Sequence, residues 1–234
     1  MISEPQSFLP LAAGDTIGIC ALSGAFEPDI FEQGIKILEH MGFRVHVPRG
    51  IYARKRYLAG DDRHRADILN ALAAMTEVKA IMCARGGFGA MRVLPLLEFD
   101  FLRRHAKPFV GFSDVSAALV SLGKRAGFPV IHGPVLTSLA KADPLTCDSL
   151  YRALTTAIHD LPDIKAPNGV TLTPGMARGM LYGGNLATIC HLCGTPFQPV
   201  FSGNILFLEE INEPAYKIDR MLTQMHQSGV FQGI

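Results

Sequence analysis

The sequence lacks the features that mark a membrane protein, a secreted protein or a nucleic-acid binder. No apolar run reaches the length of about 18 residues that a membrane-spanning helix needs. The N-terminus has no basic region followed by an apolar one, so we expect no secretory signal. The formal net charge is only +1, which gives no electrostatic reason to expect binding to nucleic acid or to an anionic membrane.

Cysteine is scarce, and the odd number of cysteines argues against a disulfide framework. The five cysteines include Cys190 and Cys193 in a C-x-x-C spacing, but the sequence has no second such pair to complete a zinc site. Because these two cysteines lie in an apolar helical pattern, we predict buried thiols and no metal. Together with the missing signal, reduced thiols predict a cytoplasmic protein.

Short apolar runs alternate with helical patterns in the first part of the chain. We predict strands at 15–22, 43–48, 78–84, 108–112 and 128–134, and helices at 29–42, 61–75, 89–97 and 114–127. Strands that are apolar throughout and separated by helices indicate a parallel sheet covered on both faces. The predicted fold class is therefore α/β, and the first predicted domain spans residues 1–156.

The second part of the chain follows a stretch with little periodicity. Residues 157–176 contain three prolines and two glycines, and we interpret them as a linker. After it we predict strands at 177–184 and 204–211, helices at 185–194 and 214–229, and a further strand that begins at 230. We interpret residues 177–234 as a second, incomplete α/β domain.

One serine stands where a predicted strand gives way to a helix, in the sequence Gly111-Phe-Ser113-Asp114. Ligands of open parallel sheets bind beyond the carboxyl ends of the strands. A serine at such a sharp turn is raised out of the sheet in the nucleophile elbow. The elbow pattern G-x-S-x-G is only half met because position 115 is valine, and the competing interpretation is that Ser113 is the N-cap of the helix.

Residues 85–89, Arg-Gly-Gly-Phe-Gly, form a second strand-to-helix turn. Glycine lets the backbone approach a ligand closely, so an N–H group of Gly86 or Gly87 could join that of Asp114 in an oxyanion hole. The turn matches neither G-x-G-x-x-G nor the P-loop pattern, so we predict no nucleotide cofactor.

Two polar residues at strand ends each allow two interpretations. Glu209 closes a strongly apolar strand, where a carboxylate is costly unless it meets water or has a partner. It is either a rim residue or the acid that orients a catalytic imidazole. His132, at the end of the fifth predicted strand, is either a hydrogen-bonded structural histidine or a contact to a substrate.

Taken in order, several sequence blocks resemble the LD-carboxypeptidases, a serine peptidase family that also contains the microcin C self-immunity hydrolases. The blocks are RADILNAL, AIMCARGGFGAMRVLP, VGFSDVSAAL, IHGP, YGGNLATI and ILFLEEINEPAYKIDRMLTQM. They extend over nearly the whole chain. The resemblance implies an N-terminal α/β domain that carries the nucleophile and a C-terminal domain, with the active site between them.

The resemblance also implies roles for individual residues. It makes Ser113 the nucleophile and Glu209 the carboxylate of the catalytic triad. It gives the oxyanion hole to the N–H groups of Gly87 and Asp114. These assignments are expectations that come from the family, beyond what the local patterns alone support.

The reaction that the resemblance implies is cleavage of a murein tetrapeptide, between an L-centre and a terminal D-amino acid. It implies a homodimer and requires neither a metal nor a cofactor. We expect contacts to this small peptide at Arg85, Gly86, His132 and Asn185. The alternative substrate within the family is a peptidyl-nucleotide antibiotic of the microcin C type.

One part of the family pattern is missing from the sequence. The resemblance places the catalytic histidine in a glycine-flanked segment near the C-terminus, and none of the eight histidines lies in such a segment. We therefore expect either a chain truncated at the C-terminus, with the triad histidine beyond Ile234, or a catalytically dead binding remnant. Without a base, activation of the serine falls by orders of magnitude while the oxyanion hole survives.

Overall fold

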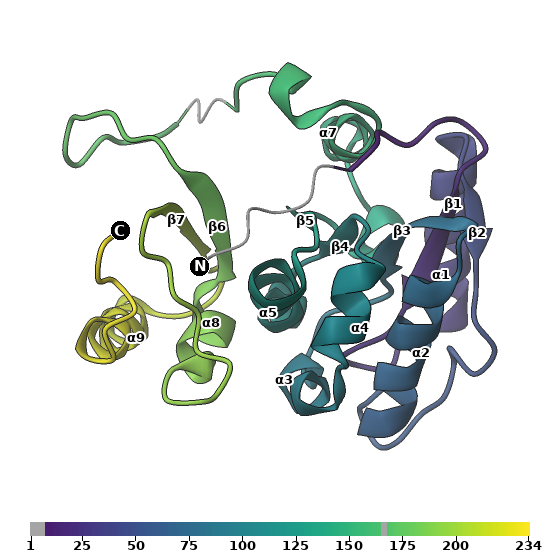
Figure 1. The fold of residues 1–234 in the computed structure, drawn as a ribbon, viewed down its shortest axis with the longest axis horizontal. Helices are drawn as coiled ribbons and strands as arrows, with labels where there is room; N and C mark the ends of the chain where they lie inside the picture. Colours follow the sequence, from purple (N-terminus) through teal and green to yellow (C-terminus); the bar gives the residue numbers. More distant parts are fainter. Residues whose placement is uncertain (1–7, 165–167) are drawn as a thin grey trace.

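The computed structural model describes residues 8–164 and 168–234, which form two parallel β-sheets with helices around them (Figure 1). The larger sheet has the strand order β2-β1-β3-β4-β5, and the smaller sheet pairs β6 with β7. The strands are β1 Thr16–Cys20, β2 Arg44–His46, β3 Val78–Cys83, β4 Phe109–Gly111, β5 Val130–His132, β6 Met180–Asn185 and β7 Asn204–Glu209. The predicted α/β class is confirmed.

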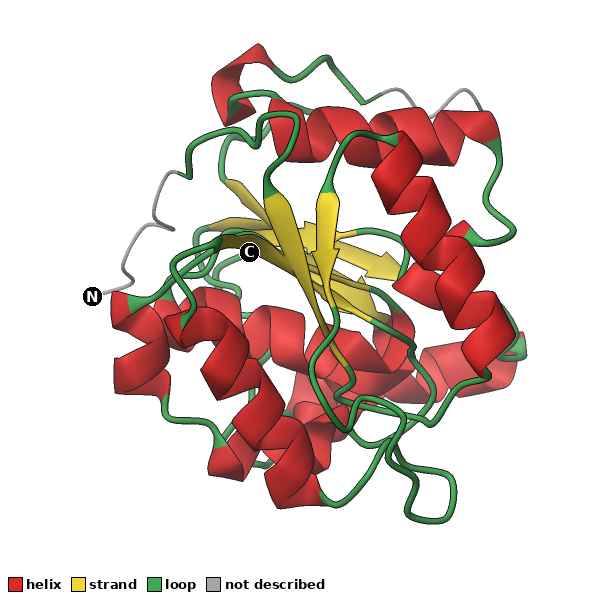
Figure 2. Ribbon diagram, turned by 90° about the vertical axis from the view of Figure 1, so that its right-hand side faces the viewer, coloured by secondary structure: helices red, strands yellow, loops and turns green. Residues whose placement is uncertain are grey.

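Helices lie on both sides of the larger sheet (Figure 2). They are α1 Pro28–His40, α2 Asp62–Ala74, α3 Ala90–Val93, α4 Phe99–Arg104, α5 Ser116–Ala126, α6 Leu136–Leu139, α7 Pro144–Thr155, α8 Leu186–Leu192 and α9 Ala215–Gln227, with short 3-10 helices η1 Leu94–Leu96, η2 Ser113–Val115 and η3 Ile158–Asp160. Because both faces are covered, Ile81, Met82 and Cys83 of β3 are fully buried, which explains the nearly continuous apolar run. Within the described ranges, no helix is long and apolar enough to cross a membrane.

The order of the strands determines where a ligand can bind. Strand β1 pairs with β2 on one side and with β3 on the other, so the direction of winding reverses between β1 and β3. In such sheets the ligand lies beyond the carboxyl ends of the strands at this switch point. The turns that leave β1, β3 and β4 contain Ser23, residues 85–89 and Ser113, respectively.

The smaller sheet joins the same region through the end of β6. Strands β6 and β7 run parallel, and Asn185 lies opposite Glu209 in their register. The backbone N–H of Asn185 donates to Ser116 Oγ at 3.0 Å, which connects the end of β6 to the first residue of α5. Helix α9 packs against the core through Ile218, Met221, Leu222 and Met225, of which Met225 is fully buried.

Two regions differ from the predictions made from the sequence. The strand predicted to begin at 230 is wrong, because residues 230–233 form turns, in which Gly233 has a left-handed φ of 73° and accepts a hydrogen bond from Gly203 at 2.7 Å. Helix α7 was not predicted from the sequence. Its first turn contains Pro144, and Asp143 caps it by accepting a hydrogen bond from the Thr146 N–H. The boundaries 1–156, 157–176 and 177–234 stay a prediction.

The cysteines of the larger sheet form a buried pair. Cys20 and Cys83 lie opposite each other on β1 and β3, with their Sγ atoms 3.4 Å apart and no disulfide between them. Burial raises the pKa of the Cys83 thiol, so the thiol stays protonated. In the C-x-x-C segment Cys190 is buried, as predicted, whereas Cys193 is only half-buried.

Candidate active site

Ser113 lies in a strained turn directly after β4 and Phe112. Its φ of 62° is left-handed, a conformation that costs a residue with a side chain about 1–2 kcal/mol. The N-cap interpretation is wrong, because neither η2 nor α5 has a side-chain cap, and Ser113 lies inside η2. Strain of this kind persists only where the surrounding structure fixes it, and it is typical of a nucleophile elbow.

The carboxylate of Asp114 joins the three turns at the switch point. Its Oδ2 accepts hydrogen bonds from Ser23 Oγ at 2.6 Å and from the Ala90 N–H at 2.8 Å. Burial raises the pKa of Asp114, and these two hydrogen bonds oppose that rise. Since Ser23 follows β1 and Ala90 begins α3, Asp114 ties both turns to the turn that carries Ser113. We did not predict a role for Ser23 from the sequence, because it belongs to no motif. Only its position just after β1 could have indicated that it lies near the site.

Gly86 is the residue of the glycine-rich turn that packs against Ser113. A Cβ atom at position 86 would lie 3.0 Å from Ser113 Cβ and 3.2 Å from its Oγ. The Gly86 carbonyl accepts a hydrogen bond from the Gly24 N–H at 3.1 Å, which fixes this turn against the turn after β1. Gly87 has a φ of 107°, which requires glycine. The close approach of backbone to the serine supports the predicted oxyanion hole, whose N–H groups stay a prediction.

The contact between Gly86 and Ser113 gives a direct test of the turn. If Ser113 is a nucleophile, we expect Gly86→Ala to lower the kcat of its reaction by about tenfold or more, because the new methyl group displaces the Ser113 side chain by a few tenths of an ångström. The melting temperature should change little, since φ at position 86 is outside the left-handed region. Gly175→Ala is the matched control, because a Cβ atom there has no neighbour within 4 Å. Unchanged kinetics in Gly86→Ala would contradict this placement of Ser113.

Arg85 serves the scaffold in this structure. One guanidinium nitrogen, Nη1, donates to the carbonyl of Ala25, in the segment that follows β1. The backbone N–H of Ala25 in turn donates to the carbonyl of Tyr57 at 2.9 Å. The expected contact of Arg85 to a substrate therefore stays a prediction, and its described hydrogen bond connects two turns.

Glu209, Asn185 and His132 come together at the carboxyl ends of β7, β6 and β5. His132 Nε2 lies 3.9 Å from Glu209 Oε1, and the two side chains are 21% and 22% exposed. The Asn185 Nδ2 donates weakly to the Glu209 carbonyl at 3.5 Å, while its Oδ1 accepts from the Thr188 N–H and so caps α8. Asn185 is thus a structural cap, and its expected contact to a substrate stays a prediction.

Burial shifts the two titratable groups of this cluster in opposite directions. It raises the pKa of Glu209, and the neighbouring Glu210 adds to the rise while Asn185 opposes it. It lowers the pKa of His132, so the imidazole is neutral at neutral pH. The hydrogen bond from the Asn185 N–H to Ser116 Oγ connects this cluster to the start of α5, three residues after the strained Ser113.

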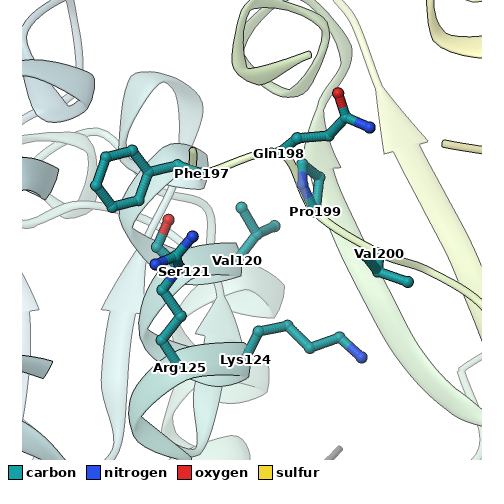
Figure 3. Close-up of a pocket in the computed structure, with 8 residues that line it drawn as sticks. All are labelled: Val120, Ser121, Lys124, Arg125, Phe197, Gln198, Pro199 and Val200. Carbon is teal, nitrogen blue, oxygen red and sulfur yellow. The ribbon is translucent and has the colours of Figure 1, made fainter. Parts of the chain in front are cut away.

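A separate hollow of about 140 Å³ lies along α5 (Figure 3). It is lined by Val120, Ser121, Lys124, Arg125, Phe197, Gln198, Pro199 and Val200. Figure 3 shows the Lys124 ammonium pointing away from Ser121, and the Arg125 guanidinium stacks on the Phe197 ring at 4.7 Å. The polar groups of this hollow do not point towards one another, and none of the candidate catalytic residues lines it.

Comparisons with known proteins agree on one family. The family model described as "LD-carboxypeptidase N-terminal domain" matches residues 17–133, and that described as "LD-carboxypeptidase C-terminal domain" matches residues 178–234. A "Probable murein peptide carboxypeptidase" of Bacillus subtilis is 34% identical over 94% of this chain and 69% of its own length. The "Murein tetrapeptide carboxypeptidase" of Pseudomonas aeruginosa is 33% identical over 97% of this chain and 75% of its own.

The solved structures extend this likeness to three dimensions. An MccF-like protein from Bacillus anthracis str. Ames superimposes with a TM-score of 0.87 at 25% sequence identity. The superposition covers 97% of this chain and 78% of that protein. MccF is the microcin C7 self-immunity protein. The relatives therefore include both proteins named as murein peptide carboxypeptidases and a protein named for self-immunity to microcin C7.

Proposed function

Since the chain belongs to the LD-carboxypeptidase family of hydrolases, we propose that it is a serine carboxypeptidase that releases the terminal D-amino acid of murein tetrapeptides. The observation that carries this proposal is the strained backbone of Ser113, held between Gly86 and the hydrogen bonds of Asp114. A serine in a helix cap or a plain loop needs no such arrangement. The names of the relatives from Bacillus subtilis and Pseudomonas aeruginosa support murein peptides as the substrate.

The proposed mechanism is acyl transfer in two steps. Ser113 Oγ attacks the scissile carbonyl while a histidine takes its proton, and the same histidine then protonates the leaving amine of the D-amino acid. Water hydrolyses the acyl-enzyme in the second step. The N–H groups of Gly87 and Asp114 stabilise the oxyanion, each by about 3 kcal/mol. Glu209 orients the catalytic histidine and stabilises its protonated form. This triad has the order Ser, Glu, His along the polypeptide, as in the α/β-hydrolases.

We also propose that the protein works in the cytoplasm as a homodimer. Buried free thiols such as the Cys20–Cys83 pair are typical of a reducing compartment. The homodimer rests on the family resemblance.

The proposed function is tested by comparing two substrates. The protein is incubated with a murein tetrapeptide or with a peptidyl-nucleotide, and free D-alanine and free nucleotide are measured by chromatography. We expect release of D-alanine and little cleavage of the peptidyl-nucleotide. A tetrapeptide that ends in L-alanine is the control and should remain intact. Cleavage of the peptidyl-nucleotide alone would favour a microcin C type activity, and tetrapeptide binding without turnover would favour a binding remnant.

A further inference from the structure

His132 is held between the two halves of the candidate site. Its ring makes an edge contact with Phe112, with centroids 5.4 Å apart, and another with Phe207, with centroids 4.8 Å apart. Phe112 directly precedes Ser113, and Phe207 lies two residues before Glu209 on β7, so Phe207 and Glu209 face the same side of that strand. The histidine is therefore clamped by one neighbour of the proposed nucleophile and one neighbour of the proposed triad acid.

The backbone also closes around this ring. His132 pairs with Gly111 in the register of β4 and β5, and a Cβ atom at Gly184 of β6 would lie 3.5 Å from His132 Nδ1. Gly184 has a φ of 145°, a conformation that glycine adopts freely and that lets β6 approach. The ends of β4, β6 and β7 thus surround the His132 imidazole. A histidine that only met solvent at the rim of the sheet would not be packed on three sides.

The polar atoms of this cluster are incompletely paired. Among residues 8–164 and 168–234, Glu209 Oε1 and His132 Nδ1 are both buried without a hydrogen-bond partner. His132 Nε2 faces that same Glu209 oxygen at 3.9 Å, and shortening this distance by about 1 Å forms a hydrogen bond. A buried carboxylate oxygen without a hydrogen-bond partner destabilises the folded protein, and a hydrogen bond from His132 Nε2–H would remove that cost.

We propose that His132 is a positioning residue, whose Nε2–H donates to the Glu209 carboxylate and holds it in the orientation that serves the catalytic histidine. This inference rests on the proposed function. A neutral imidazole suits the task, because it donates a proton in a hydrogen bond without adding a positive charge. The negative charge of Glu209 then stays available to stabilise the imidazolium that forms during the reaction. His132 itself takes no proton from Ser113 in this arrangement.

The kinetic test uses two substitutions of different chemistry on the murein tetrapeptide. We expect His132→Leu to lower kcat on the order of tenfold to a hundredfold with KM nearly unchanged, the factor that a hydrogen bond to a charged group supplies. His132→Gln should recover most of this loss, because its amide nitrogen reaches close to the position of Nε2. His105→Leu is the control, since the His105 ring likewise contacts a phenylalanine ring, that of Phe101, and its Nδ1 is hydrogen-bonded to the Phe101 carbonyl, whereas His105 makes no contact with Glu209 among the described residues.

Three outcomes of the kinetic test overturn the proposal. Equal losses in His132→Leu and His132→Gln would show that a donor at this position is unimportant. A loss confined to KM would assign His132 to substrate binding. A loss in His132→Gln as large as that of a substitution at Ser113 would make His132 the base itself.

A spectroscopic measurement separates this inference from the proposed function, because it needs no turnover. In protein labelled with ¹⁵N-histidine, the Nε2 resonance of His132 is assigned by its absence from His132→Gln. We expect this resonance to shift when Glu209→Gln removes the carboxylate, while the resonances of His105 stay in place. An unchanged His132 resonance would overturn the contact with Glu209 even if the protein cleaves murein peptides. A shifted resonance in a protein that cleaves no tetrapeptide would count against the function alone.

Discussion

Replacing Ser113 with alanine should lower kcat for tetrapeptide cleavage by about 10⁶-fold, which is the loss seen when a serine hydrolase loses its nucleophile. The substrate should still bind, because the glycine-rich turn and the hydrogen bonds of Asp114 remain. The measurements are kcat and KM from released D-alanine, and intact-mass detection of labelling by a fluorophosphonate. Only the parent protein should acquire the label.

Two further substitutions sharpen this test. Ser121→Ala is the matched control, since Ser121 lies on α5 with a buried hydroxyl that has no hydrogen-bond partner among the described residues. It should leave kcat unchanged. Ser113→Gly should be as inactive as Ser113→Ala and yet more stable by about 1 kcal/mol, because glycine accepts a φ of 62° without strain. Residual activity near that of the parent in Ser113→Ala would remove Ser113 from the mechanism.

Replacing Glu209 with glutamine should lower kcat by about 10⁴-fold, as expected when the carboxylate that orients a catalytic histidine becomes an amide. The fold should survive, because the side chains have similar volume and the amide carries no charge to bury. Glu210→Gln is the control, since Glu210 is the adjacent carboxylate and has no contact with His132 among the described residues. Equal losses in the two variants would contradict the assignment of Glu209.

The raised pKa of Glu209 adds a pH dependence to this prediction. The folded protein binds a proton at Glu209 more readily than the unfolded chain, because burial raises the folded-state pKa. The free energy of unfolding therefore increases as the pH falls from the pKa of Glu209 in the folded protein to its lower pKa in the unfolded chain. Glu209→Gln should lack this increase. Activity needs the ionised form, so the acid limb of kcat/KM should lie at a higher pH than an ordinary glutamate would give. Denaturant titrations and pH–rate profiles of both proteins measure the two effects.

The sequence predicted the elements whose signal is local. Apolar runs such as that of β3 identified the parallel sheet, because burial on both faces leaves little room for polar residues. Gly42, predicted to end the helix at 29–42, follows α1 with a φ of 91°. Helix α7 was missed because only Leu150 and Leu154 of its side chains are buried, which gives a weak periodic pattern.

The parts of the site that depend on long-range contacts were harder to predict. The left-handed φ of Ser113 leaves no trace in residue type, since valine stands where the elbow pattern has glycine. Ser23 reaches Asp114 only because β1 and β4 end at the same edge of the sheet. Similarly, the contact between His132 and Glu209 arises from the meeting of two sheets, which no spacing within the sequence encodes.

The pairing of β6 with β7 limits how this protein can change length during evolution or engineering. Asn185 stands opposite Glu209 in a sheet of two strands, and side chains alternate between its faces. A slip of one position would turn Glu209 to the opposite face and away from His132. Insertions and deletions between α8 and β7 are thus tolerable only when they preserve that alignment. A length change that shifts the register by one position would abolish the proposed activity through geometry alone, although both Ser113 and Glu209 would still be present.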